Sequence, residues 1–281
     1  MKGKKSTIIL VIILIVGLIM TTYPMVSNYF YQKNQKEIIS TYIKEVKEDI
    51  DYSEFFNKAN DYNSKLAKLN NQFGNYKTVT NINDVIKTDD LLGFITINKI
   101  KQDLPIYYGT DMNTLSNKVG ILEGTSIPIG GPSTHSVLTA HRGLKSYKLF
   151  TDLDKIEVGD IFTITIYNQI LTYQVDQIKI VKPDESDDLK IVKDEDYVTL
   201  TTCTPYGINS HRLLIRGTRI DNLKEKRIIS NEAYKINKMT VTPIICIPLL
   251  LIWILILILK PKRKEINVKD LIKGEKIWKN Y

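Results

Sequence analysis

Cys203 and Arg212 stand at facing ends of two segments that read as β-strands. A strand-like alternation of apolar and polar residues ends at Cys203, turn residues Pro205 and Gly207 follow, and a second alternating segment begins at Arg212. If the two segments pair as a hairpin, Cys203 and Arg212 are cross-strand neighbours at the base of its loop. A guanidinium beside a thiol stabilises the thiolate, which is the nucleophilic form. The pattern therefore predicts a reactive cysteine.

A thiolate nucleophile needs a proton partner, and the chain offers His135, His141 and His211. His141 lies at the end of a strand-like segment, two residues before Gly143, where a side chain is accessible. His211 is adjacent to Arg212 and therefore points to the opposite face of its strand. His135 shares a face with His141 but lies farther from the strand end. A single histidine is more often structural than catalytic, and His141 is the best placed of the three.

A developing oxyanion needs a hydrogen-bond donor, and the expected hairpin makes Arg212 the natural choice. Arg142, Arg216 and Arg219 could equally be surface charges. The sequence thus proposes the constellation of Cys203, His141 and Arg212.

The cysteine count supports a free thiol at position 203. The only other cysteine, Cys246, lies within an apolar run, where a packing role is expected, so Cys203 has no plausible disulfide partner. So few cysteines and histidines make a zinc site improbable. The acidic segment 184–196 matches no EF-hand spacing and is read as a solvated loop rather than a calcium site. We expect no metal and no cofactor.

The formal net charge of +8 is concentrated at the two ends of the chain, in residues 1–5 and 260–281. The segment between them carries no net charge, which argues against nucleic acid as a partner. Each basic end adjoins an uncharged apolar run that is long enough to span a bilayer. We expect residues 6–26 and 239–259 to be transmembrane helices. The positive-inside rule then places both termini in the cytoplasm and everything between the helices outside.

The segment between the two apolar runs changes pattern once. Residues 33–90 have helical spacing at first, with a break near Asp51, and then become polar. Residues 91–220 read as many short strands with few long helices, which favours a closed or nearly closed β-barrel. Residues 221–238 form a charged linker back to the membrane.

Three motifs in this strand-rich segment resemble the sortases, membrane-bound cysteine transpeptidases of Gram-positive bacteria. They are LPIYYGT, THSVLTAHRGL and TLTTCTPYGINSHRLLIRG, in that order along the chain. The resemblance implies a closed barrel of about eight strands. It also implies catalytic roles for His141, Cys203 and Arg212, and substrate-binding roles for Thr202 and Thr204.

The arrangement of CTPYG before HRLL, together with the second hydrophobic run, is most similar to class C, the pilin-polymerising sortases. This likeness implies cleavage of an LPxTG-like sorting signal between Thr and Gly, followed by transfer to a pilin lysine. Two alternatives stay open: attachment of surface proteins to a cell-wall precursor, and a non-catalytic membrane-tethered scaffold that keeps the barrel. Class C enzymes usually carry an Asp-Pro-aromatic lid before the barrel. Residues 58–90 contain no proline, so a lid in this possible lid region would need another anchor.

Overall fold

The computed structural model describes residues 2–46, 49–69, 72–79, 82–86, 90–144, 147–222 and Leu250. The chain divides into two compact units, Met1–Thr22 with Ile229–Tyr281, and Tyr23–Ile228. All the candidate site residues belong to the second unit.

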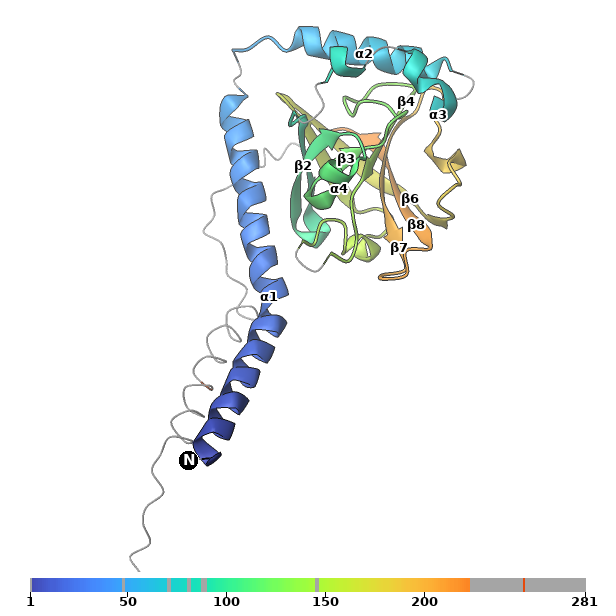
Figure 1. The fold of residues 1–281 in the computed structure, drawn as a ribbon. Coiled ribbons are helices and arrows are strands. Elements are labelled where there is room, and N and C mark those ends of the chain that lie inside the picture. Colours follow the sequence, from blue (N-terminus) through green and yellow to red (C-terminus); the bar gives the residue numbers. More distant parts are fainter. Residues whose placement is uncertain are drawn as a thin grey trace, which may run out of the picture. The chain divides into compact units, whose positions relative to one another are not determined.

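Eight strands form a closed barrel in the order β1-β2-β3-β4-β7-β8-β6-β5 (Figure 1). The pairs β2–β3 and β4–β7 are parallel, and the other neighbours are antiparallel. The expected closed barrel of about eight strands is therefore confirmed. The bounds are β1 Gly93–Ile97, β2 Gln102–Tyr108, β3 Val119–Ile121, β4 Thr134–Thr139, β5 Ile161–Ile166, β6 Gln169–Val181, β7 Asp196–Thr204 and β8 His211–Ile220.

The barrel is filled by the alternate residues of its strands. In β5, for example, Phe162 and Ile164 are buried while Thr163 and Thr165 are partly exposed. Gly217 of β8 lies close to the ring of Phe162, and a Cβ atom added at Gly217 would come within 2.7 Å of that ring. Glycine is thus required here because the neighbouring ring approaches the backbone closely.

The described residues form four α-helices, of which α2 and α3 lie at the barrel end opposite the β7–β8 turn in Figure 1. Asn63 of α2 exchanges two hydrogen bonds with the backbone of Ile127. Gln72 of α3 donates to Gly124 O and accepts from Ile191 N, so these side chains fix the helices to the barrel. The helices are α1 Lys2–Glu45, α2 Ser53–Ala67, α3 Gln72–Asn75 and α4 Met112–Asn117, with 3₁₀ turns η1 Tyr76–Thr78, η2 Ile82–Asp84, η3 Asn98–Ile100, η4 Leu153–Lys155 and η5 Asp187–Leu189.

The expected helical segment before the barrel is present, and its break lies where the sequence places it, since α2 begins at Ser53. Helix α1 is longer than expected because it runs without interruption from the first apolar run. Within the described residues, one helical segment, Val11–Glu45, is long and apolar enough to cross a membrane. The second expected span, residues 239–259, lies outside the described residues apart from Leu250, as do residues 260–281 and most of the linker 221–238.

Candidate active site

Cys203 and Arg212 face each other across the antiparallel pair β7–β8, and this pairing confirms the register expected from the sequence. The neighbours of these two residues, Thr202 and Leu213, are buried on the inner side of the barrel. Because side chains alternate along a strand, Cys203 and Arg212 lie on the outer side, and both are partly exposed. The Nη1 atom of Arg212 donates to His211 O at 3.2 Å, which holds the guanidinium near the loop base.

His141 follows β4, the strand that lies parallel to β7 on the side away from β8. Thr139 is the last paired residue of β4 and lies opposite Thr201. The ladder continues for one more bond, because Ala140 N donates to Thr201 O at 3.3 Å. The same register, extended by one further residue, would set His141 beside Cys203, because adjacent strands are about 4.8 Å apart. The strand-like segment ends at Thr139 rather than at His141, two residues earlier than the sequence suggested.

The strand register thus brings three chain segments side by side: the end of β7 with Cys203, the start of β8 with Arg212, and the segment after β4 that contains His141. A nucleophile, a proton carrier and an anion-stabilising donor suit acyl transfer through a thioester.

Comparison with known proteins agrees with this chemistry. Residues 95–220 match the family model described as the sortase domain. The structure of Streptococcus agalactiae sortase C1 in complex with MTSET is 45% identical, with a TM-score of 0.59, and the match covers 65% of this chain and 98% of that one. The chain belongs to the sortase family. Its homologues are cysteine transpeptidases, and the solved structures that it resembles are class C sortases.

Two further relatives support the assignment. Clostridium perfringens sortase C, solved with the C-terminal cell wall sorting motif, is 46% identical with a TM-score of 0.57, and the match covers 66% of this sortase and 99% of that chain. Sortase D of Bacillus subtilis (strain 168) is 28% identical over 137 residues, which is 48% of this chain and 66% of that protein.

The other two histidines of this sortase are placed differently from His141. His135 is 1% exposed; its Nδ1 lies 2.9 Å from Lys190 O and its Nε2 lies 2.7 Å from Thr199 Oγ1. Burial lowers the pKa of His135 to about 4, so the ring is neutral near pH 7. His211 contacts Ser210 Oγ at 2.9 Å and lies on the face opposite Arg212. The sequence suggested that neither His135 nor His211 would partner Cys203, and the positions of the two rings agree with this.

Thr202 and Thr204, the two residues expected to bind substrate, are buried on the inner side of the barrel at 2% and 7% exposure. Thr202 Oγ1 donates to Ala140 O at 2.7 Å, and Thr204 Oγ1 accepts from Arg142 Nη1 at 3.1 Å. Both hydroxyls are therefore used within the protein. This arrangement favours a structural role for the two side chains over the expected contact with substrate.

Arg142 is a residue whose place the sequence interpretation missed. It could have been a surface charge, yet its side chain is only 8% exposed. The available signal was alternation, because a residue that follows an outward-facing His141 points inward.

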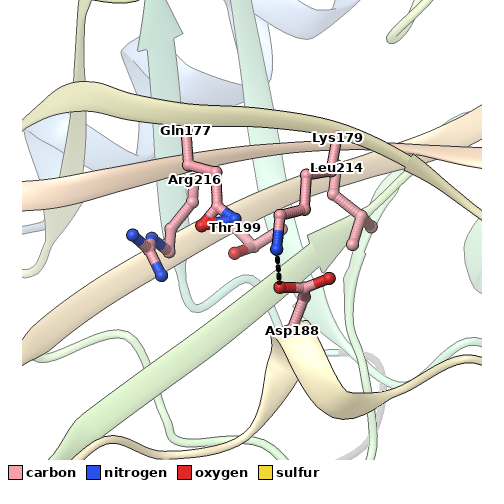
Figure 2. Close-up of a pocket in the computed structure, with 6 residues that line it drawn as sticks. All are labelled: Gln177, Lys179, Asp188, Thr199, Leu214 and Arg216. Carbon is pink, nitrogen blue, oxygen red and sulfur yellow. Dashed lines mark hydrogen bonds and ion pairs between the residues drawn. The ribbon is translucent and has the colours of Figure 1, made fainter.

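A small cavity lies on the outer side of β6, β7 and β8, next to η5 (Figure 2). Its volume of about 10 Å³ suffices for a single water molecule, and an ion pair between Lys179 and Asp188 borders it. Cys203, His141 and Arg212 do not line it, so the cavity is separate from the candidate site. Its lining residues are Gln177, Lys179, Asp188, Thr199, Leu214 and Arg216.

Several carboxylates in the acidic loop before β7, and Asp196 at the start of β7, are paired with nearby groups. Asp187 pairs with Lys190 at 2.6 Å, and Asp188 pairs with Lys179. Asp196 accepts from Gly131 N at 2.9 Å and from the hydroxyl of Tyr173 at 3.0 Å. In the part of the chain that the structure describes, no three His, Cys, Asp or Glu side chains come together as a metal site.

Proposed function

We propose that this sortase cleaves an LPxTG-like sorting signal between Thr and Gly and joins the new acyl group to the side-chain amine of a pilin lysine. The observation that carries the proposal is the register that sets Cys203 opposite Arg212 and beside the segment ending in His141. It gains support from Clostridium perfringens sortase C, whose structure was solved with the C-terminal cell wall sorting motif.

The proposed reaction assigns one task to each of the three side chains. The Sγ atom of Cys203 attacks the threonine carbonyl carbon and forms a C–S bond. Arg212 donates hydrogen bonds to the carbonyl oxygen as negative charge develops on it. His141 gives a proton to the departing glycine amine as the C–N bond breaks, which leaves a thioester. The incoming amine then attacks the thioester and loses a proton to His141, and the C–S bond breaks to release the Cys203 thiolate, which restores the thiolate and imidazolium for the next cycle.

The acceptor amine distinguishes the two enzymatic alternatives. Class C structural neighbours at 40–46% identity favour a pilin lysine over a cell-wall precursor. A competition assay tests this choice directly: a sorting-signal peptide is offered together with a lysine-bearing pilin domain and a wall-precursor amine. Preferential attachment to the precursor would favour the wall-anchoring alternative.

Sortases of Gram-positive bacteria are membrane-anchored, and α1 contains a candidate span. We propose in addition a two-pass topology in which residues 6–26 and 239–259 cross the membrane, both termini are cytoplasmic and the barrel is extracytoplasmic. Confinement to the membrane that holds the substrate would raise the rate of their encounter.

The decisive experiment compares Cys203→Ala with Cys246→Ala in the detergent-solubilised full chain. We expect Cys203→Ala to abolish both peptide transfer and the thioester adduct detected by mass spectrometry. Cys246→Ala is the matched control and should keep both, because that residue belongs to the second apolar run. Transfer by Cys203→Ala at an undiminished rate would refute the proposed nucleophile.

A further inference from the structure

Arg142 carries a buried guanidinium at the inner side of the barrel end that bears the candidate site. Its Nη1 donates to Thr204 Oγ1 at 3.1 Å, and its Nη2 donates to Asp154 Oδ2 at 2.6 Å. Its Nε is buried and has no hydrogen-bond partner among the described residues. The group thus links the segment after β4 with the end of β7 and with η4.

The link lies where the backbone ladder between β4 and β7 stops. The last backbone bond joins Ala140 N to Thr201 O at 3.3 Å. Beyond it, side chains continue the connection: Thr202 Oγ1 donates to Ala140 O at 2.7 Å, and Arg142 donates to Thr204. The residues on either side of Cys203 are therefore tied to the residues on either side of His141.

We propose that Arg142 is a positioning residue that fixes the imidazole of His141 beside the thiol of Cys203. This inference rests on the proposed catalytic roles of those two residues. Arg142 directly follows His141, so anchoring the Arg142 side chain restricts the backbone torsions that aim the His141 ring. Asp154 completes the clamp by holding the guanidinium from the other side.

If Arg142 served only to close the end of the barrel, a buried guanidinium would not be needed there. Burying a guanidinium is costly, and an apolar residue of similar volume is often as stabilising as a buried ion pair. Asp154 is 50% exposed, so solvent screens part of its attraction to Arg142. The presence of a buried guanidinium at this position, despite the free energy that its burial costs, is better explained by the precise geometry of its forked hydrogen bonds.

The first test measures peptide transfer by the full chain carrying Arg142→Gln or the milder Asp154→Asn, which leaves the arginine in place. Because misplacing a catalytic group by about 1 Å can cost about a hundredfold, we expect kcat to fall by about that factor in Arg142→Gln, with KM changed less than about threefold. Asp154→Asn should lower kcat in the same direction by a smaller factor.

Asp176→Asn is the matched control, because it breaks a comparable ion pair, with Arg216 at 2.6 Å, on the outer side of the same barrel. It should keep the wild-type kcat. If Arg142→Gln and Asp154→Asn both keep the wild-type kcat, or if the control loses as much as they do, the inference is overturned.

A double-mutant cycle separates positioning from simple loss of stability. The rate at which an alkylating reagent modifies Cys203, measured across pH, can be followed even in inactive variants. Arg142→Gln should change this profile toward that of His141→Ala and should change it no further when His141 is already Ala. An equal effect of Arg142→Gln in both backgrounds would overturn the inference. If His141→Ala transfers peptide at the wild-type rate, the proposed function fails, and this inference fails with it.

Discussion

Acidification is expected to destabilise the barrel through His135, which the proposed mechanism does not use. The ring donates through Nδ1 to Lys190 O, because a carbonyl oxygen can only accept, and its Nε2 then accepts from the Thr199 hydroxyl. Protonation would force the Thr199 hydroxyl to give up its hydrogen bond to Nε2 and accept one instead, and it would place a positive charge in a site that is 1% exposed. Burial lowers the pKa of His135 most, and the charge of Arg216 lowers it further; the hydrogen bond to Lys190 O and the charges of Asp176 and Asp188 raise it by less.

The magnitude follows from the two pKa values. In the unfolded chain the histidine has its ordinary pKa of 6.5, whereas in the folded chain the value is about 4. Above 6.5 the ring is neutral in both states, so its contribution does not vary with pH. As the pH falls below 6.5, only the unfolded state gains the proton. The free energy of unfolding should therefore be about 2.5 kcal/mol lower at about pH 4.5 than at about pH 7.5.

Urea denaturation of the wild type and of His135→Asn at both pH values isolates this contribution. Asn keeps a donor for Lys190 O but does not titrate, so the variant is less stable at neutral pH and its stability depends less on pH. Other groups titrate in both proteins and cancel in the comparison. If both proteins lose the same stability on acidification, the ring is protonated normally in the folded chain and the reasoning is wrong.

Three other predictions follow. Gly217→Ala should destabilise the fold by about 1–3 kcal/mol in urea denaturation, since its Cβ would lie 2.7 Å from the ring of Phe162; an unchanged midpoint would mean that the ring moves freely. Arg212→Lys should keep the charge but lose most peptide transfer, because an ammonium lacks the forked donors, whereas the control Arg219→Lys should stay active; a fully active Arg212→Lys would reduce its role to charge alone. Protease added to intact protoplasts should digest the barrel and spare residues 260–281, and digestion of that tail first would exclude the two-pass topology.

The sequence was sufficient for the hairpin that carries Cys203 and Arg212, because alternation and turn residues are local signals. The proximity of His141 was less accessible. It depends on parallel pairing between β4 and β7, which are far apart in the chain and whose contact no local pattern reveals. The expectation that His141 acts together with Cys203 came from the resemblance to sortases.

Hydrogen-bond partners were also beyond the sequence pattern. Thr202 falls on the same face as Val198 and Leu200, so its burial could be inferred. The hydrogen bond from its hydroxyl to Ala140 O depends on where the parallel pairing of β4 and β7 ends, which the sequence does not reveal. Arg142 was missed for the same reason, because its inward direction follows from alternation but its partner Asp154 comes from a separate 3₁₀ turn.

The position of Cys203 on the outer surface of a closed, filled barrel bears on the size of the molecules that can react. For the sorting signal proposed as substrate, nothing has to enter the barrel, so the thiol has to meet only that short segment. Folded domains of any bulk can stay attached on either side of that segment, outside the enzyme. A nucleophile in an enclosed chamber would instead set an upper limit on the mass of its substrate, and a product that grows with every reaction would soon reach that limit.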